Sequence, residues 1–83
     1  MRFKDFEIRK INDDKYEVVK WTDNYCFTIA FIDWDKHEDS WEFDGVGMRF
    51  INYYENGLCD YIKKYMDLID VVRNHSFEYE DVN

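Results

Sequence analysis

Four carboxylates stand close together in the middle of the chain: Asp33, Asp35, Glu38 and Asp39. Such oxygen atoms are the ligands that calcium prefers, of which it takes about six to eight. An EF-hand loop beginning at Asp33 would need a carboxylate or amide where His37 stands and a glycine where Glu38 stands. Neither condition is met. The sequence therefore predicts a solvated acidic loop and no metal site.

Two histidines, His37 and His75, are the candidates for a general base. No glycine-rich phosphate loop accompanies them, and the only serines are Ser40 and Ser76, neither in an activated-nucleophile pattern. We therefore expect no catalytic residue, no enzyme activity and no cofactor.

The two cysteines, Cys26 and Cys59, are too few for a disulfide framework. In a cytosolic chain, a cysteine is by default reduced and packed inside as a small apolar residue. A zinc centre would also need His37 and His75, which lie far from either cysteine along the chain. The sequence thus predicts two buried, reduced cysteines.

Acidic residues outnumber basic ones by 19 to 11, which gives a net charge of −8. The segment from Asp33 to Met48 contains six acidic residues and one basic residue, Lys36, so it carries −5 of that charge. A negative chain has no electrostatic attraction for nucleic acid or anionic lipid, so we expect no direct nucleic-acid partner and no membrane. Because no apolar run could span a bilayer and Met1–Asp5 is unlike a signal peptide, we expect a cytoplasmic protein.

Aromatic residues make up 20% of the chain, more than the core of a small domain can hide. We assign to the core Trp21, Phe27, Phe31, Phe43 and Tyr65. Other aromatics then lie on the surface, either as the rim of the core or beside charge, as in protein interfaces. Trp34 and Trp41 flank the acidic loop, and Tyr53 and Tyr54 follow it. The predicted partner-binding residues are Asp33, Trp34, Asp35, Glu38, Asp39, Trp41, Glu42 and Asp44.

Strands separated by polar turns are expected to position these residues, because β-branched and aromatic residues alternate in the first half of the chain. The expected strands are Phe3–Ile11, Tyr16–Trp21, Tyr25–Trp34 and a fourth around Trp41 and Phe43. The third strand is apolar on both faces, with Phe27, Ile29 and Phe31 on one and Ala30 and Ile32 on the other, as in a central strand. Short connections favour an antiparallel meander.

The second half of the chain is expected to be helical. Asp44-Gly45 could close a hairpin that leads into a fifth strand, but Phe50, Ile51 and Tyr54 are spaced at helical intervals, which favours a short helix. A break at Asn56-Gly57 then precedes an amphipathic helix over Leu58–Arg73. Its apolar face carries Leu58, Tyr61, Ile62, Tyr65, Leu68, Ile69 and Val72, and its polar face carries Asp60, Lys63, Lys64, Asp67, Asp70 and Arg73. The alternating tail from Ser76 predicts an edge strand or a frayed end.

Together these patterns predict one α+β domain over residues 1–83, with an antiparallel sheet of three to five strands packed on a C-terminal amphipathic helix. We expect a non-enzymatic protein-binding module that docks on a basic partner. Its charge and size are those of an immunity-type inhibitor of a toxin nuclease, or of an anti-defence protein whose carboxylates replace phosphates in a nucleic-acid-binding host enzyme. The alternative is a structural homodimer formed through the second face of the sheet.

Overall fold

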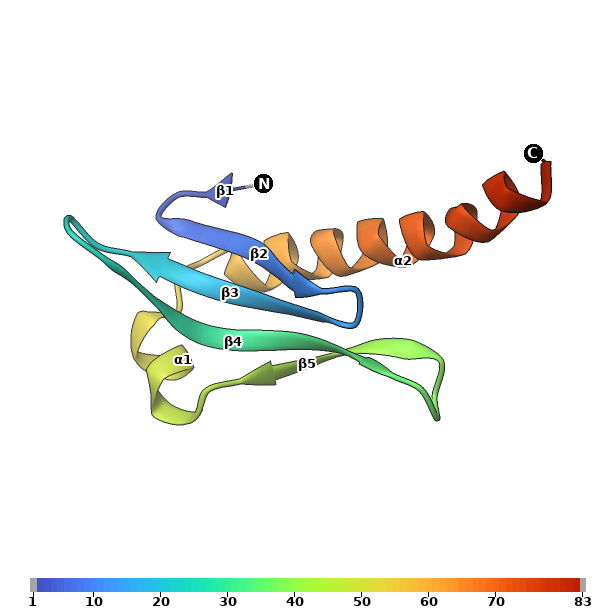
Figure 1. The fold of residues 1–83 in the computed structure, drawn as a ribbon. Coiled ribbons are helices and arrows are strands. Elements are labelled where there is room, and N and C mark those ends of the chain that lie inside the picture. Colours follow the sequence, from blue (N-terminus) through green and yellow to red (C-terminus); the bar gives the residue numbers. More distant parts are fainter. Residues whose placement is uncertain (1, 83) are drawn as a thin grey trace.

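The computed structural model describes the backbone of residues 2–82 and the side chains of residues 2–74. A five-stranded antiparallel sheet in sequential order is followed by two helices (Figure 1). The elements are β1 (Arg2–Phe3), β2 (Phe6–Asn12), β3 (Lys15–Trp21), β4 (Cys26–Asp35), β5 (Ser40–Gly45), α1 (Gly47–Tyr53) and α2 (Leu58–Val82). The predicted α+β meander is therefore confirmed.

The first predicted strand is in fact two strands. The chain reverses at Lys4-Asp5, where Lys4 has a positive φ of 53°, and Phe3 pairs with Phe6 across the turn. This reversal brings the Phe3 ring to 5.4 Å from the ring of Tyr61 on α2. This turn, which contains no glycine, therefore packs the partly buried Phe3 ring against the buried Tyr61 ring.

A β-bulge in β4 changes which side chains share a face. The register with β3 shifts after Val18 and skips Ile29, so Ile29 and Ala30 are both fully buried against the helical side. Beyond the bulge the alternation is reversed. Ile32 points to the same side as Ile29, and Phe31 points to the opposite side, which corrects the predicted grouping of Ile29 with Phe31.

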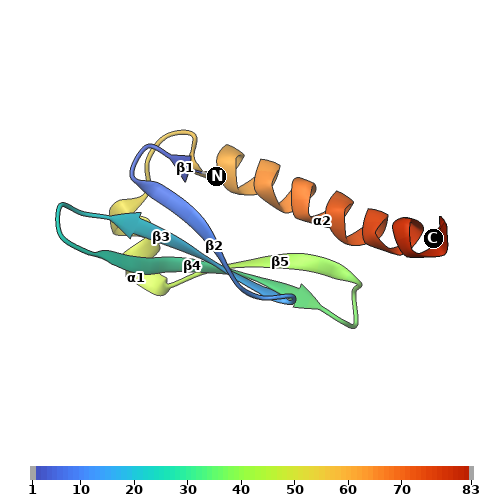
Figure 2. The ribbon, with the colours of Figure 1, turned by 45° about the horizontal axis from the view of Figure 1, so that its top comes forward.

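One face of the sheet packs against α2, as predicted, while its other face carries no helix in the described part of the chain (Figure 2). Burial against this sheet raises the pKa of Tyr61 on α2 to about 12. Phe27 and Tyr65 pack against the buried core, as expected. The core itself consists of Phe6, Ile8, Val18, Ile29, Ala30, Ile32, Leu58, Tyr61, Ile62 and Ile69.

The segment after β5 forms helix α1, so the helical alternative is confirmed over a fifth-strand hairpin. Its Phe50 ring lies 5.2 Å from the ring of Phe43, and Tyr53 contacts Phe27. The predicted break is also present, because Gly57 adopts a φ of +89° before α2 begins. A Cβ atom at this position would lie 3.2 Å from the Phe3 ring, so glycine suits both the backbone and the packing.

Helix α2 leaves the sheet before it ends and extends past the β2–β3 turn (Figure 1). Ile69 is still buried, but Leu68 and Val72 are 47% and 56% exposed, so their predicted burial is wrong. The sheet is too short to cover the whole apolar stripe. The helical backbone continues through Val82, so of the two alternatives predicted for the tail from Ser76, the edge strand does not form.

Candidate protein-binding surface

Strands β4 and β5 carry most of the predicted partner-binding residues, but they present them on two faces. The register places Asp33 opposite Glu42, and Trp34 opposite Trp41. Paired residues share a face and consecutive residues alternate between faces. The acids therefore point to the open face of the sheet, and the tryptophans point to the face that carries α2.

The acidic surface, as we define it, comprises Asp33, Asp35, Glu42 and Asp44 on the open face with Glu38 and Asp39 in the adjoining loop. Lys15 lies 3.5 Å from the Asp33 carboxylate. Within the described part of the chain, no basic side chain forms an ion pair with Glu42 or Asp44.

Crowding of like charges is evident at Glu42. Its pKa is raised, first by the hydrogen bond and charge of Asp35 and then, more weakly, by desolvation and by the charges of Glu38 and Asp33. A cationic group placed here would relieve this repulsion. The acidic surface is therefore suited to a positively charged ligand.

Asp35 has a structural part in the loop between β4 and β5. One of its carboxylate oxygens accepts hydrogen bonds from the backbone N–H groups of His37 (2.8 Å) and Glu38 (3.2 Å), which lowers the Asp35 pKa. The loop closes at Asp39, whose φ is +56°. His37 itself is exposed, and the side chain of His75 lies outside the described residues. Among the described side chains, no cluster is arranged to hold a metal ion.

The two tryptophans belong to an aromatic cluster beneath α2. Their rings lie 5.2 Å apart, and Trp41 also contacts Tyr16 at 5.4 Å. The Arg73 guanidinium lies 4.0 Å from the Trp34 ring centre and bonds to the Asp13–Asp14 turn. The sequence places Arg73 on the solvent face of α2, but its contacts tie α2 to the sheet. The Trp41 indole Nε1 is buried and has no hydrogen-bond partner in the described structure.

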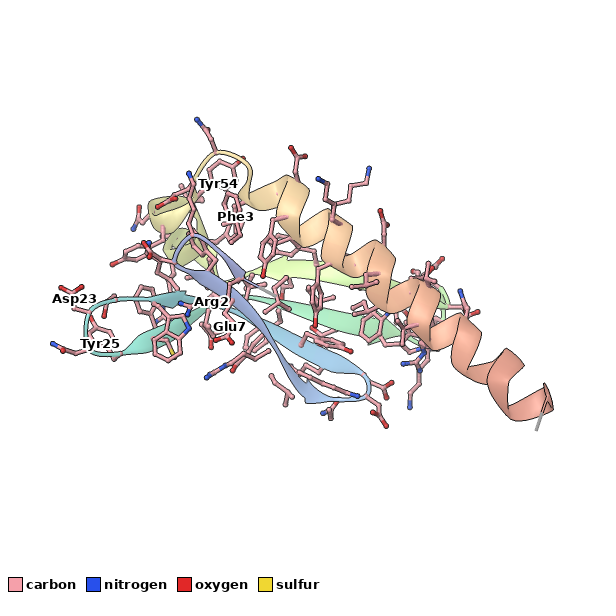
Figure 3. All side chains as sticks on the ribbon, turned by 90° about the horizontal axis from the view of Figure 1, so that it is seen from above. Arg2, Phe3, Glu7, Asp23, Tyr25 and Tyr54 are labelled. Carbon is pink, nitrogen blue, oxygen red and sulfur yellow. The ribbon has the colours of Figure 1, made fainter. Side chains whose placement is uncertain are left out.

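On strands β1 to β3 of the open face, charged and polar side chains are paired. Arg9 lies 2.7 Å from the Glu17 carboxylate, and the Trp21 indole donates a hydrogen bond of 2.9 Å to Glu7. Arg2 lies over the Trp21 ring, near Glu7 (Figure 3). Local pairing therefore leaves most of the excess negative charge of this face on β4 and β5, where only Asp33 has an ion-pair partner among the described side chains.

A groove that the sequence did not reveal runs between β5 and α2. A cavity of about 180 Å³ opens there, lined by Phe43, Cys59, Ile62, Lys63 and Met66. Phe43 is 39% exposed, so its assignment to the core is wrong. Trp21 and Phe31 are likewise only half-buried, on the open face. The groove depends on where α2 crosses the sheet, which local patterns do not encode.

The predicted burial of both cysteines is wrong. Both are free thiols, but Cys26 is half-buried and Cys59 is exposed in the first turn of α2. The apolar stripe of α2 passes through Leu58 and Ile62, which turns Cys59 toward the rim of the groove.

We expect Ellman's reagent to label Cys59 in the native protein, because access to the thiol limits such reactions. Cys26 should react more slowly, and Cys59→Ser should remove the fast phase from the absorbance trace. A fast phase that persists in Cys59→Ser would contradict this assignment.

Comparison of the chain with protein-family models, curated proteins and solved structures finds no match. Neither helix in the described residues has an apolar stretch long enough to cross a lipid bilayer.

Proposed function

We propose that this protein is a non-enzymatic binding module of the cytoplasm that docks its acidic surface on a basic protein. The observation that carries the proposal is the concentration of carboxylates on β4 and β5 at the open face, where Glu42 and Asp44 have no ion-pair partner among the described side chains. Such a surface attracts a basic partner over distances of about 10 Å at ordinary salt and orients it during encounter. Nuclease toxins and nucleic-acid-binding host enzymes present basic surfaces of this kind.

The layout of the carboxylates favours a protein surface over a single cation. Asp33 and Glu42 lie opposite each other on neighbouring strands, and Asp44 follows Glu42 on the same face. Side chains that share a strand face repeat about every 7 Å, and strands lie about 4.8 Å apart. Carboxylates on this flat grid can each meet a different Lys or Arg side chain, as the phosphates of a nucleic acid would.

Two double variants with equal net charge isolate the acidic surface. Glu42→Lys with Asp44→Lys changes the open face, whereas Asp23→Lys with Asp67→Lys changes exposed sites elsewhere. Each reversal adds two charges, so both variants go from −8 to −4. Asp23 lies in the β3–β4 turn, at the far end of the sheet (Figure 3). Asp35 is left unchanged because it holds the loop.

Affinity purification from the native host should recover a basic protein with the wild type and with the Asp23/Asp67 variant, but not with the Glu42/Asp44 variant. With the purified partner, surface plasmon resonance should show association about tenfold slower for the Glu42/Asp44 variant at low salt, because rim charges act mainly through steering. Equal association rates for the two variants would contradict the proposal. Recovery of the chain with itself alone would favour the homodimer.

A further inference from the structure

Strand β5 is an open edge of the sheet. It pairs with β4 on one side, and on its other side the described chain places no strand (Figure 1). An edge strand presents unpaired backbone N–H and C=O groups, which can pair with another extended chain. The opposite edge is divided between β1, which has only two residues, and the part of β2 after Glu7, which β1 does not pair; β5 has six residues in one strand. In the described chain, β5 is therefore a continuous open edge along its whole length.

The two faces of the sheet meet at this edge. Glu42 and Asp44 point to the open face, and Phe43 points to the helical face beside the groove. A ligand on the open face alone would contact only the two carboxylates, and a ligand on the helical face alone would contact only Phe43 and the groove. An added strand touches both, because its side chains alternate between the two faces.

We propose that β5 is the docking edge for an extended segment of the basic partner, in which Lys or Arg alternates with large apolar residues. This inference rests on the proposed function and specifies how the partner binds. The basic side chains lie beside Glu42 and Asp44, and an apolar side chain enters the groove against Phe43, Ile62 and Met66. Backbone hydrogen bonds to β5 supply affinity, and the alternate side chains supply specificity.

A second copy of the chain is a poor occupant of the same edge. Two β5 strands side by side would bring Glu42 and Asp44 of one copy next to those of the other. Like charges on directly opposed strands are destabilising, and each copy already carries a net charge of −8. The charge pattern of the edge therefore selects a basic segment over self-pairing.

Three capped synthetic peptides test this mode of binding. In the first, Lys alternates with Val and Leu; the second is the same peptide with N-methylated backbone amides; the third has Glu in place of Lys. Each is titrated at low salt into isotope-labelled protein and followed by amide chemical shifts. The Lys peptide should shift the amide resonances of residues 40–45 and of the groove residues Cys59, Ile62, Lys63 and Met66.

N-methylation should weaken binding by at least about tenfold, because it removes the donors that pair with β5. The Glu peptide should not bind. The protein variant Phe43→Ala should bind the Lys peptide more weakly than the wild type does, whereas Asp67→Lys should bind it as the wild type does. Equal binding of the methylated and unmethylated peptides would overturn strand addition and leave charge-driven docking intact. Absence of binding by both Lys peptides would instead contradict the proposed function itself.

Discussion

The substitution Ile62→Asp is expected to unfold the domain, whereas Lys63→Asp should leave it folded. Ile62 is 3% exposed and belongs to the core between α2 and the sheet. A carboxylate there would be buried without a partner, which costs several kcal/mol, and a domain of this size is stable by only about 5–15 kcal/mol. Lys63 is exposed one residue further along the helix.

Circular dichroism during thermal and urea unfolding measures both variants. We expect Ile62→Asp to lose its cooperative transition, and Lys63→Asp to stay within about 0.5 kcal/mol of the wild type, as surface changes usually do. Ile62→Val, which removes one methylene group, should cost about 0.5–1.5 kcal/mol and serves as the conservative control. Equal destabilisation by the two Asp variants would show that the helix presents another face to the sheet.

The existence and phase of α2 follow from the sequence because its periodicity is local. Tyr61, Ile62 and Ile69 recur at helical intervals and are buried as expected. The extent of burial is not local. It depends on where the helix diverges from the sheet, so the same stripe leaves Leu68 exposed, and the polar face supplies Arg73 to the tryptophan cluster.

The sequence predicts the acidic residues and the two tryptophans as one patch, whereas the structure places them on two faces of the sheet. Trp41 and Glu42 are consecutive in a strand, and alternation alone places them on opposite faces. The strand register was needed to show that Asp33 joins Glu42 and that Trp34 joins Trp41. The groove beside Phe43 could not be predicted from the sequence, because its other wall is formed by α2, which is distant along the chain.

The bulge in β4 is the feature that most changes the expected core. An unbroken strand would place Ile29 and Phe31 on the same face, as alternation predicts. The skipped register position instead gives Ile29 to the core and leaves Phe31 half-buried on the open face, with the Lys15 ammonium 4.5 Å from its ring centre. No residue in this stretch signals a bulge, since neither glycine nor asparagine is present.

Ile29→Ala and Phe31→Ala should therefore differ in their effects on stability, even though phenylalanine is the larger side chain. Ile29 is fully buried, so its truncation should cost about 2–5 kcal/mol through lost burial and the cavity left behind. Phe31 is only partly removed from water, and its loss should cost about 1 kcal/mol. Urea unfolding of the two variants, fitted with a common slope, measures both free energies. An equal or larger loss for Phe31→Ala would mean that β4 continues without the bulge, with both side chains in one core.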